Sequence, residues 1–221
     1  MGAIYWQLND CWPVISWSSI DYYGRWKALH YYAKRFFASV MLSCEEQSWM
    51  TVEADMNRQH FEFEKSIRLN VTNETLDAHR VLVKWAVRKT DATILREEEQ
   101  WLEVPALSAV WMDKVELPQI DCFNEYVSYE AWENDQIISQ GTVIFSYPKY
   151  FHYLNPGLAV RVDGDDIVVK AEAYAKSVEI RNENDDLILE DNYFDMNAGE
   201  YRVKILDGKP DGLKVRSVYD I

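Results

Sequence analysis

The stretch that decides the fold opens the chain. Residues 2–13 read Gly-Ala-Ile-Tyr-Trp-Gln-Leu-Asn-Asp-Cys-Trp-Pro, and residues 16–19 read Ser-Trp-Ser-Ser. Residues 3–6 are an apolar and aromatic run that gives way to polar residues at Gln7, Asn9 and Asp10, as a buried strand does where it ends in a loop. This pattern predicts a strand over residues 3–6.

An amphipathic pattern follows the loop. Trp26, Leu29, Ala33 and Phe36 recur at three- and four-residue spacing, which predicts a helix over residues 25–37 with one apolar face. A strand followed by such a helix is half of a βαβ unit, and the neighbouring strands of its parallel sheet must come from elsewhere.

These residues resemble the last strand and last helix of the (β/α)8 barrel in family 2 β-mannosidases. The likeness rests on residues 2–10, 12–13, 16–19, 26–27, 30–31 and 33–37. In that family, β-sandwich domains follow the barrel. Residues 191–200 and 213–217 also resemble the family's terminal domain. The resemblance therefore spans the chain, and it is strongest near the start.

After the helix the pattern changes to strands. Every second residue of 81–87 is a valine or tryptophan, so we predict that Val81, Val83, Trp85 and Val87 point into a core. The alternate residues, Leu82, Lys84, Ala86 and Arg88, are predicted to point outward. We expect a first set of strands at residues 49–55, 66–72, 79–90, 94–104, 108–117, 125–132 and 141–146. Seven strands in about 110 residues fit an immunoglobulin-like sandwich.

A second set of short strands follows a segment rich in proline and aromatic residues. It comprises residues 158–162, 167–173, 177–181, 187–190, 199–206 and 213–219, separated by Asp-Gly and Asn-Asp turns. The predicted fold class is thus mainly β: two immunoglobulin-like sandwich domains preceded by the last strand and helix of a barrel. We predict boundaries at 1–38 for the barrel unit, 39–147 for the first sandwich, 148–157 for a linker and 158–221 for a small C-terminal sandwich.

Composition excludes several classes of protein. The formal net charge of −14 would repel nucleic-acid phosphates, so nucleic acid is not an expected partner. No apolar run approaches the ~20 residues of a membrane span, and no signal-peptide pattern opens the chain. Nothing in the sequence assigns a cellular compartment. The three cysteines have no metal-like spacing, and we expect reduced thiols.

The resemblance implies a parent enzyme of carbohydrate metabolism that hydrolyses terminal non-reducing β-D-mannose residues with retention, without a cofactor. Such chemistry needs two carboxylates ~5–5.5 Å apart, and in the family both are glutamates on earlier barrel strands. The Asn-Glu pairs here begin at Asn73, Asn124 and Asn182, at predicted turns or strand starts. We therefore predict no catalytic residue in this piece and no activity from it alone.

Barrel sites lie at the carboxyl ends of the strands. Trp6, Asn9 and Asp10 would then line one wall of the sugar site, because an indole ring stacks on a sugar face while amides and carboxylates bind hydroxyls. Capping of the loop is the alternative role for Asn9 and Asp10. We expect Trp12 and Trp17 to pack rather than to bind. His30 lies beside the apolar stripe of the helix, and we expect it to be a structural histidine.

Two other functions remain open. One is a non-catalytic carbohydrate-binding or scaffolding module, with sugar platforms among Trp49, Trp85, Trp101, Trp111 and Trp132. The other is a related family 2 β-galactosidase or β-glucuronidase. The expected partners are a mannoside or manno-oligosaccharide and the remainder of the barrel; a homo-oligomer is compatible with the sequence. Without that remainder, we expect residues 1–20 to lose their barrel conformation and the helix to pack on the first sandwich.

Overall fold

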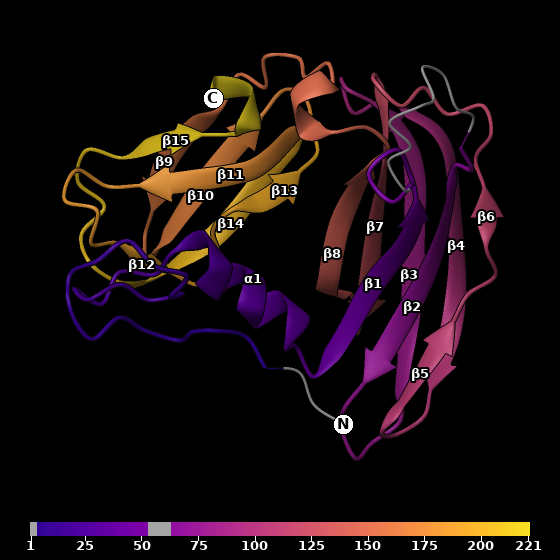
Figure 1. The fold of residues 1–221 in the computed structure, drawn as a ribbon, viewed down its shortest axis with the longest axis horizontal. Coiled ribbons are helices and arrows are strands. Elements are labelled where there is room, and N and C mark those ends of the chain that lie inside the picture. The colour runs from indigo at the N-terminus through magenta and orange to yellow at the C-terminus, as the bar shows by residue number, and fades with distance from the viewer. Residues whose placement is uncertain (1–3, 53–62) are drawn as a thin grey trace. The chain divides into compact units, whose positions relative to one another are not determined.

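The structure, a computed structural model, describes residues 4–52 and 63–221. The chain forms two compact units: Ala38–Tyr153 is one, and Met1–Phe37 together with Leu154–Ile221 is the other. We call the strands of Ala38–Tyr153 the first sandwich and those of Leu154–Ile221 the second sandwich. All strand pairs in both are antiparallel (Figure 1).

Two four-stranded sheets build the first sandwich. One has the order β1-β2-β5, with β6 also paired to β2, and the other has the order β4-β3-β7-β8. The elements are β1 (Val40–Gln47), β2 (Ser66–Asn73), β3 (His79–Lys89), β4 (Ile94–Val104), β5 (Ser108–Trp111), β6 (Val115–Glu116), β7 (Glu125–Glu133), β8 (Gln136–Ile144) and the 3-10 turn η1 (Pro148–Tyr150).

The core of the first sandwich lies between these sheets. Val81, Val83, Trp85 and Val87 are all buried, as their alternation in β3 predicts. They belong to the same hydrophobic cluster as alternate residues of β2, on the facing sheet. Because every second side chain of a strand points to one face, the pattern of one strand is enough to indicate its buried side.

One predicted strand of this unit is wrong. Residues 49–52 form a turn, and the remainder of the predicted strand, residues 53–55, lies outside the described residues. The sequence reasoning instead missed β1, which pairs with β2 over its whole length. In β1 only Leu42 is fully buried, so the strand lacks the alternation that marks a half-buried strand.

The second sandwich has two smaller sheets, ordered β12-β14-β10-β9 and β13-β11-β15. Its core contains Ile167, Val169 and Val203, and no residue is shared with the core of the first sandwich. The elements are β9 (Ala159–Asp163), β10 (Asp166–Ala171), β11 (Ala175–Arg181), β12 (Ile188–Leu189), β13 (Phe194–Met196), β14 (Gly199–Asp207), β15 (Lys214–Arg216) and the 3-10 turn η2 (Val218–Asp220).

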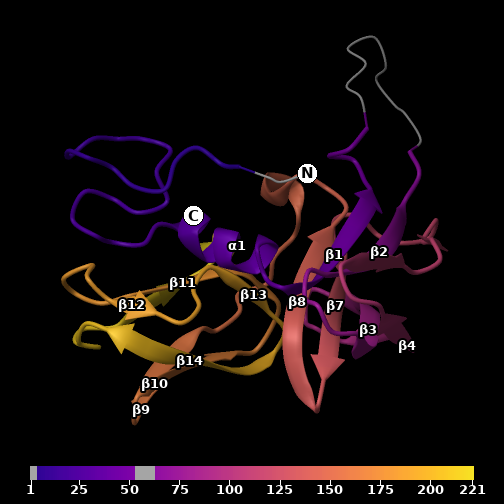
Figure 2. The ribbon, with the colours of Figure 1, turned by 90° about the horizontal axis from the view of Figure 1, so that it is seen from below.

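The helix α1 (Ala28–Phe36) packs on the second sandwich, not on the first as expected (Figures 1 and 2). Tyr31 is 1% exposed and lies in the core of the second sandwich. Arg35 donates to Asp191 Oδ1 at 2.6 Å and to the carbonyls of Asn192 and Tyr193. The predicted stripe is partly wrong, because Phe36 is 43% exposed. Periodicity identified the helix but could not identify its partner.

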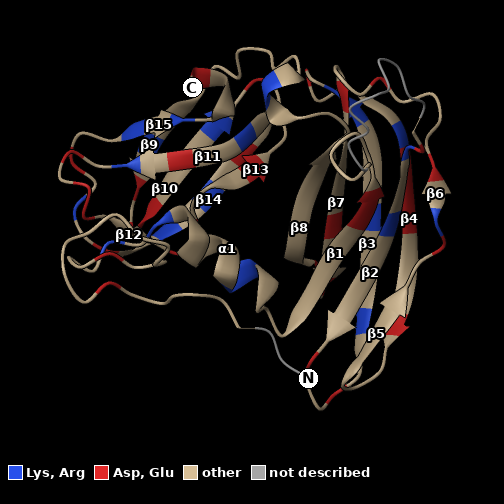
Figure 3. Cartoon of the chain, in the orientation of Figure 1, with Lys and Arg blue, Asp and Glu red and all other residues tan. Residues whose placement is uncertain are grey.

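Charged residues of both signs are interspersed over the strands of each unit (Figure 3). Several are paired between strands: Arg80 of β3 with Glu103 of the neighbouring β4, and Arg161 of β9 with Glu200 of β14, across the intervening β10. Among the described residues, no helix has the length and apolar character needed to cross a bilayer.

Candidate functional site

The candidate site is the loop that leads from Trp6 to helix α1. Its two ends are joined by backbone hydrogen bonds: the amide of Ser19 donates to the carbonyl of Gln7 at 3.0 Å, and that of Ile20 donates to Leu8 at 2.8 Å. The amide of Asp10 donates back to Ile20 at 3.1 Å. The loop is therefore closed at its base, although only single bridges, and no strand, form among residues 4–27.

The strand predicted over residues 3–6 is wrong for the part that is described. Ile4, Tyr5 and Trp6 have no strand partner, and residue 3 lies outside the described residues. A strand exists only where a neighbour accepts and donates its backbone hydrogen bonds. The peptide bond between Trp6 and Gln7 is cis.

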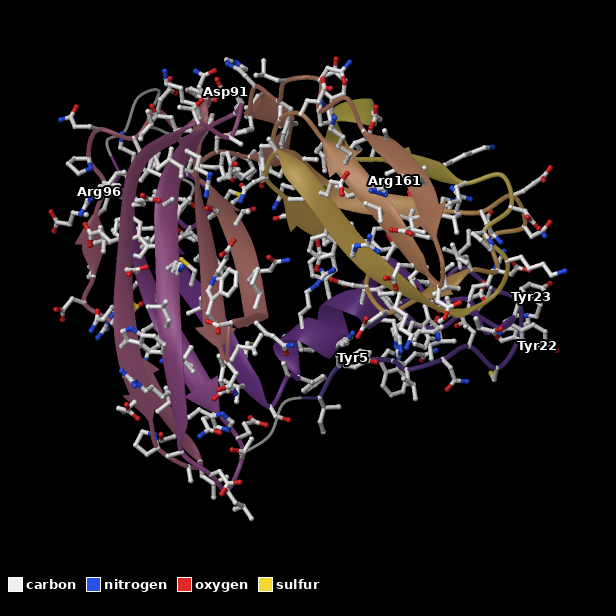
Figure 4. All side chains as sticks on the ribbon, turned by 180° about the vertical axis from the view of Figure 1, so that it is seen from behind. Tyr5, Tyr22, Tyr23, Asp91, Arg96 and Arg161 are labelled. Atoms are coloured by element: carbon white, nitrogen blue, oxygen red, sulfur yellow. The ribbon has the colours of Figure 1, made fainter. Side chains whose placement is uncertain are left out.

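Trp6 presents its indole ring to solvent. The residue is 75% exposed, while Tyr5 before it is half-buried. The Tyr5 ring lies 6.3 Å from that of Phe36 and 6.2 Å from that of Phe37, at the end of helix α1 (Figure 4). The ring of Trp6 is thus accessible to solvent. The residues before and after it, Tyr5 and Gln7, are held by contacts with helix α1 and with Ser19.

Asn9 and Asp10 differ in their accessibility. Asn9 is exposed, and its Nδ2 donates to the backbone oxygen of Asp10 at 3.2 Å. Asp10 is 6% exposed and directs its carboxylate into the loop. Of the two, only Asn9 has a side chain that reaches solvent directly.

Three side chains surround the Asp10 carboxylate. Ser16 Oγ donates to Oδ1 at 2.5 Å, Ser18 Oγ donates to Oδ2 at 2.7 Å, and Lys27 Nζ lies 3.3 Å from Oδ2. The hydrogen bonds from Ser16 and Ser18, with the nearby Lys27 ammonium, hold the pKa of Asp10 below its usual value. Asp10 is therefore an ionised group that organises the loop, the capping role that the sequence left open.

Several other residues of the loop lie where the sequence did not place them. Trp12 and Trp17 are 63% and 75% exposed, so the expectation that they pack is wrong for this chain. Tyr22 and Tyr23 stand at the outer tip of the loop (Figure 4). His30 has the structural role expected of it: burial lowers the pKa of its imidazole, and Nδ1 lies 3.1 Å from Ser19 Oγ.

The sequence reasoning missed Ser16, Ser18 and Lys27 as partners of Asp10, and Tyr5 as a partner of Ser19. The Tyr5 hydroxyl lies 2.9 Å from Ser19 Oγ. The only signal available was the unusual density of serines at residues 16–19 after an acidic residue. Which serine meets which group depends on how the loop closes, and spacing alone does not give this.

The asparagines of the three Asn-Glu pairs have structural roles in turns. Asn73 is 1% exposed, and its Nδ2 donates to the carbonyls of Asp77, Val104 and Pro105. Asn124 binds Asp121, and Asn182 binds Asp186. Each of these asparagine side chains is thus engaged within the fold.

The tryptophans considered as platforms for a binding module have different environments. Trp85 is 3% exposed and belongs to the core. Trp101 and Trp111 are 54% and 48% exposed, but the guanidinium groups of Arg80 and Arg68 lie over their rings at 4.5 and 4.9 Å. Trp6, in contrast, has no cation over its ring among the contacts found for the described residues.

The two acidic side chains of the loop with lowered pKa values, Asp10 and Asp21, are both engaged by other side chains. Asp10 is used internally, and Asp21 is bound by the Arg25 side chain at 2.6 Å. Within the described part of the chain, no group of three or more His, Cys, Asp and Glu residues is placed to hold a metal ion. An exposed aromatic ring can contact a sugar, whereas glycoside hydrolysis by a retaining enzyme needs a pair of carboxylates.

Comparison with known proteins defines the class of the two sandwiches. Residues 65–150 match the Mannosidase Ig/CBM-like domain, and residues 153–221 match the Ig-fold domain of the Ig_mannosidase model. Both are immunoglobulin-like domains of the mannosidase type, so the predicted fold class of two such sandwiches is confirmed.

Relatives extend this likeness to the whole chain. Beta-mannosidase B of Thermothelomyces thermophilus is 28% identical over 99% of this chain and 27% of its own length. Beta-mannosidase of Capra hircus is 63% identical over 41 residues, which are 19% of this chain and 5% of the relative. A crystal structure of Beta-D-Mannosidase from Dictyoglomus thermophilum matches the fold with a TM-score of 0.75 and 22% identity, over 96% of this chain and 25% of that one.

The resemblance drawn from the sequence is thus confirmed: the chain is similar to the C-terminal part of a family 2 glycoside hydrolase of the β-mannosidase type. The chain spans about a quarter of the length of the relatives that it matches over its whole extent.

Proposed function

We propose that the chain is the C-terminal portion of a β-mannosidase that removes terminal non-reducing β-D-mannose residues from mannosides. The proposal is supported by relatives that bear the name beta-mannosidase. Hydrolysis would proceed with retention, using two glutamates from the part of the barrel that this chain does not contain. A mannoside or manno-oligosaccharide would be the substrate.

In this proposal the chain supplies one wall of the sugar site, with Trp6, Asn9 and Asp10 as the residues concerned. The observation that carries it is the exposed indole of Trp6 between backbone neighbours that are held in place. The flat ring would stack on the C–H face of a mannose ring, and the Asn9 amide would bind a hydroxyl. Asp10 would contribute indirectly, because its hydrogen bonds with Ser16 and Ser18 stabilise the conformation of the loop.

The remainder of the barrel is the proposed partner of the same loop. Ile4, Trp12, Ile15 and Trp17 are each more than 60% exposed, at 97%, 63%, 102% and 75%. Covering one such side chain stabilises by about 1.5–3 kcal/mol. Neighbouring barrel strands and helices would bury this surface, and the two sandwiches would give structural support.

An activity assay tests whether the catalytic glutamates lie outside this chain. The purified chain of 221 residues should release no p-nitrophenol from p-nitrophenyl β-D-mannopyranoside above a buffer blank, because the glutamate pair is absent. Turnover that copurifies with the chain through two chromatographic steps would contradict this. A chimera that joins the chain to the preceding part of a β-mannosidase should restore hydrolysis of the mannoside in preference to the galactoside and glucuronide.

The sugar contact can be tested on the chain by itself. Saturation-transfer NMR with methyl β-D-mannopyranoside should show transfer to the sugar protons, and Trp6→Ala should abolish it. Trp17→Ala is the matched control, because both indoles are 75% exposed and lie on the same loop. Equal loss in the two variants would show adventitious contact with exposed tryptophans and would refute the assignment of Trp6.

A further inference from the structure

The hydroxyl of Ser19 lies at the meeting point of three groups. Ser19 is 0% exposed, and its Oγ lies 2.9 Å from the Leu8 carbonyl oxygen, 2.9 Å from the Tyr5 hydroxyl and 3.1 Å from His30 Nδ1. A hydroxyl has one proton and two lone pairs. If Ser19 donates to Leu8, it accepts from Tyr5 and from His30, which requires the His30 tautomer that carries its proton on Nδ1.

This arrangement holds the backbone on both sides of Trp6. Before Trp6, the ring of Tyr5 packs on Phe36 and Phe37, and its hydroxyl binds Ser19. After Trp6, the carbonyl of Gln7 accepts from the amide of Ser19, and the carbonyl of Leu8 accepts from its hydroxyl. One buried serine thus joins the residues on either side of the exposed indole.

His30 connects this junction to the second sandwich. His30 lies on helix α1, and the residue that follows it, Tyr31, is buried in the core of that sandwich. One turn further on, Lys34 donates to the carbonyl of Glu190 at 2.7 Å and Arg35 binds Asp191. All of these contacts lie within one compact unit, so they form a continuous path from the sandwich to Trp6.

We infer that Tyr5, Ser19 and His30 are positioning residues for Trp6, and that the second sandwich, through helix α1, determines where the indole is presented to a sugar. The inference rests on the proposed function in one respect: that Trp6 is the sugar platform. Contacts are effective only when the residues that carry them are held by a supporting shell. The second sandwich is then part of the recognition apparatus and not only a support.

Fluorine NMR of the full chain labelled with 5-fluorotryptophan tests the positioning. Trp6→Phe identifies the Trp6 resonance by its disappearance. Ser19→Ala and His30→Leu should shift this resonance and narrow it, since the ring gains mobility, while the resonance of the core residue Trp85 stays in place. His30→Asn should return the Trp6 resonance toward its original position, because an amide nitrogen can replace Nδ1–H as the donor.

A milder pair of variants keeps the test valid if Ser19→Ala unfolds the chain. Tyr5→Phe removes one hydroxyl from the junction and should move the Trp6 resonance. Tyr22→Phe removes a hydroxyl from the exposed tip of the same loop and should not (Figure 4). An unchanged Trp6 resonance in Tyr5→Phe and in folded His30→Leu would overturn the inference.

Binding of methyl β-D-mannopyranoside separates this inference from the proposed function. Saturation transfer should weaken by about threefold to tenfold in Tyr5→Phe and His30→Leu, the range for losing one well-placed contact, and recover in His30→Asn. If the unmodified chain shows no transfer, the sugar platform fails, while the fluorine spectra still decide whether the three residues position Trp6. Weaker binding without recovery in His30→Asn would count against the inference.

Discussion

Replacing Tyr31 by alanine should destabilise the second sandwich although the residue lies more than 120 positions before its first strand. Tyr31 is 1% exposed, packs with the core of that sandwich, and accepts a hydrogen bond from the Leu189 amide at 3.4 Å. Removing a buried aromatic side chain typically costs about 3–5 kcal/mol. That is a large share of the ~5–15 kcal/mol that stabilises a domain.

Hydrogen exchange followed by mass spectrometry gives the result segment by segment. In Tyr31→Ala, amides of β10 and β14 that exchange by global opening of their unit should exchange roughly a hundredfold to several thousandfold faster. Peptides from the first sandwich should keep their rates, because the two cores share no residue.

The neighbouring tyrosine is the control. Tyr32 is 40% exposed; its hydroxyl lies 3.1 Å from Ser177 Oγ, and the Arg35 guanidinium lies over its ring at 4.9 Å. Tyr32→Ala should accelerate exchange in β10 by less than about tenfold, since exposed substitutions rarely cost more than a kcal/mol. The reasoning is refuted if Tyr31→Ala and Tyr32→Ala act alike, or if Tyr31→Ala accelerates β3 and β10 equally.

Three further results are expected. Iodoacetamide at pH 8 should modify the exposed Cys11 within minutes and leave Cys44 unmodified in the folded chain, because burial raises the pKa of Cys44 to about 12. Equal labelling of the two cysteines, measured by peptide mass spectrometry, would contradict this. Arg35→Ala should lower the free energy of unfolding of the second sandwich, measured in urea, by about 1.5–3 kcal/mol. Arg35→Lys should recover only part of this loss, since lysine lacks the planar guanidinium that binds Asp191 and two carbonyls together. Full recovery in Arg35→Lys would show that charge alone matters. Because the pKa of Asp10 is lowered in the fold, the contribution of Asp10 to loop stability should be complete above the ordinary carboxyl pKa of about 3.9. This contribution should be lost as the pH falls through the lower pKa of the folded state. The Ser18 amide resonance should report the transition, and Asp10→Asn should remove the transition.

The candidate site was predicted from the sequence only in part. Trp6 could be named because a strand-like run ends there and the family resemblance places a sugar beyond it. The exposed fraction of its ring, the inward turn of the Asp10 carboxylate and the junction at Ser19 could not be named, because each depends on how residues 7–10 meet residues 19–20. Hydrogen-bond partners eight to fourteen positions apart in an irregular loop follow no period that a sequence displays.

By itself, the sequence determined the mainly β class, the buried face of β3 and the presence of an amphipathic helix, because alternation and three- to four-residue spacing are local consequences of strand and helix geometry. Only the tertiary structure decided which sandwich receives the helix. An apolar stripe specifies that it must be covered and not what covers it; here the choice rests on Tyr31 in a core built from residues 167–203 and on Arg35 bound to Asp191, 156 positions away. The same long-range packing formed β1, whose weak alternation gave no local sign of a strand, through its register with β2.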